Sequence, residues 1–163
     1  MDESINWQSK LQNSLAQGRE AQSKITSVNQ INDLIQRFEN GTLPRCDWTH
    51  HAHLIVALWY LIHYSQDKAI HYIRNGIQRY NQAIGIKTTK DSGYHETLTL
   101  FWVKIVRQYL ATKGTDCSMV DLANGLIECC GNPNLPLDYY SSDRLMSWEA
   151  RLNWVEPDLN SPV

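Results

Sequence analysis

Four of the six histidines lie in two short motifs whose spacing suits metal binding. WTHHAHL (48–54) holds three of them and GYHET (93–97) holds the fourth. On an α-helix, residues three apart point about 60° apart, so His50 and His53 share a face. His51 lies about 160° from His53, so these two side chains cannot share a ligand. The pair that can converge is therefore His50 and His53.

The hydrophobic pattern predicts the helices that position these motifs. Apolar residues recur at helical spacing in successive segments, with Gly and Pro clustered between them. The run Leu54–Ile62 is apolar almost all round, which predicts that its helix is central. No segment has the pattern of a strand. The expected helices run over about 28–39, 49–64, 67–84, from after Gly93 to 111, and 118–130, with a short final helix near 145–154.

Short loops between these segments favour antiparallel neighbours. The predicted fold is all-α, an antiparallel up-and-down helical bundle of about five helices with an irregular C-terminal lid. A length of 163 residues suits one hydrophobic core, so residues 28–163 are expected to form a single domain. Residues 1–27 are rich in Gln, Asn and Ser and are interpreted as a polar arm or a peripheral helix.

This topology predicts that the two histidine motifs meet. In an up-and-down bundle, helices 49–64 and 94–111 begin at the same end, which brings His50, His53 and His95 together. Imidazole favours Zn, Fe, Ni or Cu over Mg or Ca, and three protein ligands leave a position open for water or substrate. We therefore expect a divalent transition metal, Zn, Fe or Ni, held by His50, His53 and His95.

Other residues expected at that end can complete an active site. Glu96 is our first choice as general base or fourth ligand, with Glu39 as the second choice. Arg79 can bind a substrate carboxylate or phosphate, and Tyr94 can donate a hydrogen bond to a bound oxyanion. The simpler interpretations are a solvated arginine at a helix end and an aromatic ring that only packs.

Three classes of function remain open at this stage. The first is a metal-dependent enzyme, a hydrolase or an oxidoreductase, that acts on a small polar molecule. The second is a metal-free protein that binds or senses a small molecule through its histidines, Arg79 and tyrosines. The third is an interaction module that uses the N-terminal arm or an apolar helix face. Haem is a lesser option, and the sequence does not indicate an oligomeric state.

Composition argues against several partners. The net charge is −2 and no basic run occurs, so we expect no nucleic acid partner. The longest apolar run, Leu54–Ile62, is far shorter than the ~20 residues that span a bilayer, so we expect no membrane partner. The first ten residues have no signal-peptide pattern, and the four cysteines form no CxxC pair. We therefore expect a cytoplasmic protein with reduced thiols.

Four longer stretches carry a resemblance. They are FENGTLPRCDWTHHAHL (38–54), IQRYNQAIGI (77–86), GYHETLTLFW (93–102) and YYSSDRLMSWEAR (139–151). In these motifs the chain resembles a family of small bacterial proteins of uncharacterised function with WTHxAHL and GYHET motifs. The resemblance implies the helical bundle and draws attention to His50, His53, His95 and Glu96. It implies no substrate.

Overall fold

The computed structural model describes residues 24–114 and 116–161, and every regular element in these ranges is a helix. The predicted all-α bundle with irregular C-terminal elements is confirmed. Most of the expected N-terminal arm, including Trp7, Leu11 and Leu15, lies outside the described residues. None of the described helices is long and apolar enough to cross a membrane.

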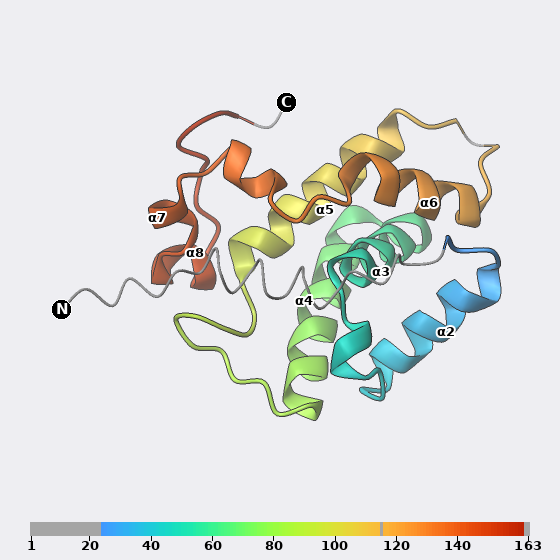
Figure 1. Cartoon of the computed structure of the whole chain (residues 1–163), viewed down its shortest axis with the longest axis horizontal. Coiled ribbons are helices and arrows are strands. Elements are labelled where there is room, and N and C mark those ends of the chain that lie inside the picture. Colours follow the sequence, from blue (N-terminus) through green and yellow to red (C-terminus); the bar gives the residue numbers. More distant parts are fainter. Residues whose placement is uncertain (1–23, 115, 162–163) are drawn as a thin grey trace.

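Helix α3 (His50–His63) is the centre of the bundle, as its all-round apolar character predicts. It packs against the four other long helices. The two short C-terminal helices, α7 (Ser142–Leu145) and α8 (Trp148–Leu152), lie on the side of the bundle away from α2 (Figure 1). Leu54 and Leu58 of α3 are fully buried in the main core. The helices around it are α2 (Val28–Glu39), α4 (Gln66–Ala83), α5 (Glu96–Ala111) and α6 (Met119–Cys130).

Side-chain caps explain where several of these helices begin. The hydroxyl of Ser27 accepts from the backbone N–H of Gln30, whose side chain in turn accepts from the Ser27 N–H. Thr49 accepts from the N–H of Ala52, 3.2 Å away, and so starts α3 one residue before His50. A short 3₁₀ turn, η1 (Arg45–Asp47), precedes this cap. The first histidine motif is thereby held on the first turn of α3.

The start of α5 corrects the prediction that this helix begins directly after Gly93. His95 has an extended backbone, with φ −139° and ψ 107°, and is the N-cap rather than a helical residue. Gly93 has φ 85°, and a Cβ there would lie 2.7 Å from the carbonyl oxygen of Lys87. The close approach of the backbone at Gly93 therefore sets how Tyr94 and His95 enter the helix.

The C-terminal region corrects a second prediction. The expected single helix near 145–154 is two short helices, α7 (Ser142–Leu145) and α8 (Trp148–Leu152). The hydroxyl of Ser147 accepts from the N–H of Ala150, which starts a new helix where the pattern alone predicts one continuous helix. Together with η2 (Leu135–Asp138), these elements pack on α5 around a second core. The buried residues of that core are Phe101, Ile105, Tyr140, Leu145, Ala150 and Val155.

Candidate functional site

The three predicted histidines line one cavity, which we call the histidine cavity. His50 and His53 come from the first turn of α3, and His95 comes from the cap of α5. The cavity has a volume of about 530 Å³. Most of its other walls are apolar or aromatic, including Trp48, Val56, Ala57, Ile73, Ile77, Leu98, Trp102 and Val103.

His53 has one ring nitrogen fixed and one free. Its Nδ1 lies 2.7 Å from the carbonyl oxygen of Thr49, and because a carbonyl can only accept, Nδ1–H is the donor. The lone pair is therefore on Nε2, which has no hydrogen-bond partner within the described part of the chain. Because Nε2 is not among the fully buried atoms without a partner, it is open to the cavity. Loss of contact with water lowers the pKa of His53 to about 4. The bond to Thr49 raises the pKa, but this effect is the smaller of the two. At neutral pH, His53 is therefore an uncharged hydrogen-bond acceptor.

His50 has the opposite tautomer. Its Nε2 lies 3.4 Å from the carbonyl oxygen of Cys130, so Nε2–H donates in a long hydrogen bond and Nδ1 carries the lone pair. Its ring centroid lies 4.4 Å from that of Trp102. Burial, against the bond to Cys130 and together with the neighbouring His53 and His51, lowers the pKa of His50 to about 4. His50 is therefore a second neutral imidazole at this cavity.

His95 differs because both of its ring nitrogens are in use. Nε2–H donates to the carbonyl oxygen of Leu145 at 2.8 Å, and Nδ1 accepts from the N–H of Leu98 at 3.2 Å. Burial lowers the pKa of this imidazole also to about 4. A metal would have to displace either the helix cap or the bond to α7. Across residues 24–114 and 116–161, no group of three or more His, Cys, Asp or Glu side chains is placed to share a metal ion.

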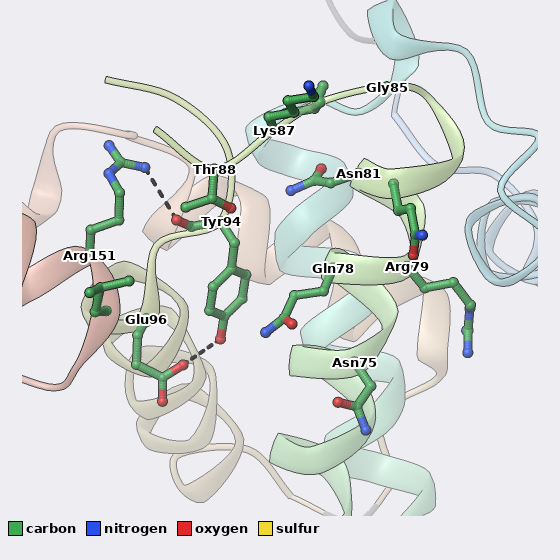
Figure 2. A pocket seen from close by; sticks show the side chains of 13 residues that line it. Asn75, Gln78, Arg79, Asn81, Gly85, Lys87, Thr88, Tyr94, Glu96 and Arg151 are labelled. Carbon is green, nitrogen blue, oxygen red and sulfur yellow. Dashed lines mark hydrogen bonds between the residues drawn. The ribbon is translucent and has the colours of Figure 1, made fainter. Parts of the chain in front are cut away.

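A second cavity of about 920 Å³ lies beside the first, and we call it the polar cavity. Asn81, Ile86 and Tyr94 line both cavities. Figure 2 shows that the polar cavity is formed between α4 and the segment that carries Thr88 and Tyr94. The carboxamides of Asn75, Gln78, Asn81 and Gln82, all on α4, contribute to its wall.

Glu96 belongs to the polar cavity and not to the histidine cavity. The hydroxyl of Tyr94 donates to its Oε2 at 2.5 Å, and Arg74 forms an ion pair with its Oε1. Burial raises the pKa of Tyr94, and the bond to Glu96 raises it further. Both carboxylate oxygens of Glu96 thus already have strong partners. The second-choice carboxylate, Glu39, accepts from the hydroxyl of Tyr60 at 2.6 Å and takes no part in lining the histidine cavity.

Arg79, predicted to bind a substrate carboxylate or phosphate, does not line the histidine cavity. It is exposed and contributes to the wall of the polar cavity. Its side chain projects away from Tyr94 and Glu96, on the other side of α4 (Figure 2). Of the residues predicted to bind substrate, Tyr94 alone reaches both cavities.

Sequence reasoning missed residues that shape this region. Arg151 of α8 is only 6% exposed, and its guanidinium donates to four backbone carbonyls in the segment before α5. The pattern gives no signal for that role, because the acceptors are backbone oxygens far away in the chain. Asn81 did leave a signal: it lies four residues after Ile77 and eight after Ile73, on the buried stripe of α4.

Comparison with known proteins gives no match, because no family model, no curated protein and no solved structure is significantly similar to this chain. Membership of the family with WTHxAHL and GYHET motifs stays a prediction. The function is therefore argued from the geometry of the two cavities.

Proposed function

We propose that this protein binds a small molecule in the histidine cavity without a metal, and that His50 and His53 act as neutral hydrogen-bond acceptors. The observation that carries the proposal is the lone pair on Nε2 of His53, which has no partner among the described residues at a largely apolar cavity. Cavities of roughly 300–1,000 Å³ with apolar walls and a few polar groups are typical of small-molecule sites. The volume of about 530 Å³ lies within that range.

The chemistry of the ligand follows from the state of the imidazoles. Burial keeps His50 and His53 uncharged at neutral pH, so they do not attract an anion. Each has one nitrogen committed to a backbone carbonyl and one left to accept. A ligand with an apolar body can pack on the walls, and an N–H or O–H group on it can donate to these nitrogens. A hydrogen bond from a matching donor to such a nitrogen contributes about 0.5–1.5 kcal/mol.

The test is ligand-induced stabilisation of the metal-depleted protein. A panel of small polar and heterocyclic molecules is screened for an increase in Tm, since a ligand that binds only the folded state raises it. His53→Phe keeps an aromatic ring beside Trp48 and removes the acceptor. We expect stabilisation in the parent protein and its loss in His53→Phe.

His63 provides a matched control. Its Nδ1–H also donates to the carbonyl four residues earlier at 2.7 Å, and its ring stacks on Trp59 at 4.2 Å, but it is exposed and away from the cavity. His63→Phe should therefore leave stabilisation unchanged. The proposal is wrong if no molecule in the panel raises the Tm, or if both variants lose the effect equally.

A metal-dependent enzyme, a hydrolase or an oxidoreductase, is the second candidate, and one observation favours it. Metal-bound histidines almost always donate their second ring N–H to a carbonyl or carboxylate, and His50 and His53 both donate to backbone carbonyls. In this hypothesis Zn, Fe or Ni is held by these histidines. Glu96 would serve as general base only after exchanging Tyr94 or Arg74, because it lines the neighbouring polar cavity with both carboxylate oxygens paired.

Elemental analysis of protein never exposed to chelator separates the two candidates. The comparison should use His50→Ala/His53→Ala, because His95 also caps α5 and its loss would disturb the fold. Stoichiometric metal in the parent, absent from the double variant, favours the enzyme. A cytoplasmic location is part of either proposal, and it is supported by four cysteines that are free thiols.

A further inference from the structure

The side chain of Asn81 is a buried polar group that the fold does not use. The residue is 8% exposed, and no hydrogen bond joins its carboxamide to another group in the part of the chain that the structure describes. The one fully buried side-chain atom without a partner there is Nδ1 of His51, so the carboxamide atoms of Asn81 are open to the cavities that they line. At the end of α4, Asn81 takes part through its backbone and not through its side chain: its carbonyl oxygen accepts from the N–H of Ile86 at 2.8 Å. Buried polar side chains in folded proteins nearly always have partners. The carboxamide of Asn81 has none within the fold but is open to two cavities, where a ligand can pair with it.

We propose that the ligand of the histidine cavity is a flat, uncharged heterocycle with a hydrogen-bond donor and an acceptor side by side, which pairs with the carboxamide of Asn81. The inference rests on the proposed function and names its ligand class. A carboxamide presents an acceptor oxygen and a donor NH₂ at a fixed separation, so it matches an amide, lactam or amidine edge in a bidentate manner. Figure 2 shows this side chain extending from α4 towards the segment that carries Thr88 and Tyr94.

The walls of the histidine cavity favour a flat aromatic ring. Trp48 and Trp102 both line it. Trp48 already packs on Phe38 and His53, and Trp102 packs on His50, so the remaining aromatic surface of this wall gives a flat ring apolar contact. Nε2 of His53 is a further acceptor for an N–H on the same ligand. These groups are directional and uncharged, which suits a heterocycle better than an ion.

The charge of the lining supports an uncharged ligand. Among the described residues around the histidine cavity, Arg45 is the only one with a Lys, Arg, Asp or Glu side chain, and it is exposed. Asn81 and Tyr94 also line the polar cavity, so a polar substituent on the ring has room to extend past them.

The experiment compares probes that carry a hydrogen-bond donor and an acceptor side by side with a probe that carries only a donor. Adenine carries an amidine edge and hypoxanthine a lactam edge, whereas indole has a similar ring size with a donor and no acceptor. Binding to the full chain is measured by thermal shift and by calorimetry. We expect adenine or hypoxanthine to bind at least about tenfold more tightly than indole, the discrimination typical of a bidentate pair.

Two variants on α4 connect this preference to Asn81. Asn81→Leu removes the carboxamide at similar volume, and Gln82→Leu removes an exposed carboxamide that lines only the polar cavity. Asn81→Leu should lower affinity for the preferred probe at least about tenfold, with Gln82→Leu unchanged. The Tm of ligand-free Asn81→Leu should be unchanged or higher, because the carboxamide makes no bond within the fold. That result also shows that the variant folds.

Three results would overturn the inference. The first is indole binding as tightly as both purines, and the second is unchanged purine affinity in Asn81→Leu. The third is a lower Tm of ligand-free Asn81→Leu, which would make the carboxamide a structural group satisfied by ordered water. If neither purine binds but another small molecule does so through His53, the heterocycle inference fails and the proposed function stands. If nothing binds, both fail.

Discussion

The indole ring of Trp48 lies on the imidazole of His53, with ring centroids 3.8 Å apart. On the same indole, Phe38 of α2 stacks at 4.7 Å with an interplanar angle of 19°. The histidine is thereby connected to the core through two aromatic rings, and the bond to Thr49 fixes its rotation. The half-buried ring has lost much of its contact with water, which lowers the pKa of His53 to about 4, so the ring is neutral at pH 7 and presents a single lone pair.

The free energy of unfolding should fall as the pH is lowered through the range in which His50, His53 and His95 become protonated in the unfolded chain. The pKa of His50, His53 and His95 is about 4 in the fold against 6.5 for a free side chain. Between these values the unfolded chain binds more protons, so the free energy of unfolding decreases as pH decreases. The loss begins near pH 6.5 and ends near pH 4. Each pKa unit is worth about 1.4 kcal/mol per group.

Urea unfolding at stepped pH between 7 and 4.5 measures this effect. His53→Phe removes one of the three groups, so its stability should depend less steeply on pH than that of the parent. Parallel curves for the parent and His53→Phe would show that the fold does not lower the pKa of His53.

His95 should stabilise the fold by capping the N-terminus of α5. His95→Ala removes the acceptor for the Leu98 N–H and the donor to the Leu145 carbonyl, and should cost about 2–3 kcal/mol. His95→Asn keeps a capping oxygen and should recover about 1 kcal/mol of that loss. Urea unfolding curves give both values. Equal destabilisation by the two substitutions would argue against the capping role.

Arg151 should hold the segment before α5 in place. Its guanidinium donates to the carbonyls of Lys90, Ser92, Gly93 and Tyr94, so Arg151→Ala leaves these acceptors without their donor. We expect a loss of about 3 kcal/mol and faster tryptic cleavage after Lys87 and Lys90.

Arg144→Ala is the control for this variant. Arg144 donates through Nε to one backbone oxygen, that of Glu156, at an exposed position. Its loss should cost less than 1 kcal/mol and leave cleavage after Lys90 unchanged. Equal cleavage rates in the two variants would show that Arg151 does not order this segment.

Helical periodicity was sufficient to predict the bundle and most of its helix ends. Val28–Glu39 is found with the predicted bounds, because Ser27 and Asn40-Gly41 are ordinary start and stop signals. The pattern predicts His95 inside the helix, because histidine is not a usual capping residue and its second partner, Leu145, is 50 residues away. No local pattern contains that contact.

The candidate site was predictable in position but not in chemistry. Topology brought His50, His53 and His95 to one end, since alternate helices of a bundle start together. Which nitrogen of each ring stays free depends on backbone oxygens of Thr49 and Cys130, and these are set by the fold. Asn81 stood on the buried stripe of its helix, but only the structure shows that its carboxamide has no partner among the described residues.

The most direct test of the central claim is ¹⁵N NMR of the histidine side chains in metal-depleted protein at pH 7, recorded before and after adenine is added. We predict neutral rings, with the proton on Nδ1 of His53 and on Nε2 of His50, and a shift of the unprotonated Nε2 of His53 when adenine binds. A charged His53, or ring nitrogens that respond to Zn²⁺ and not to adenine, would contradict this claim.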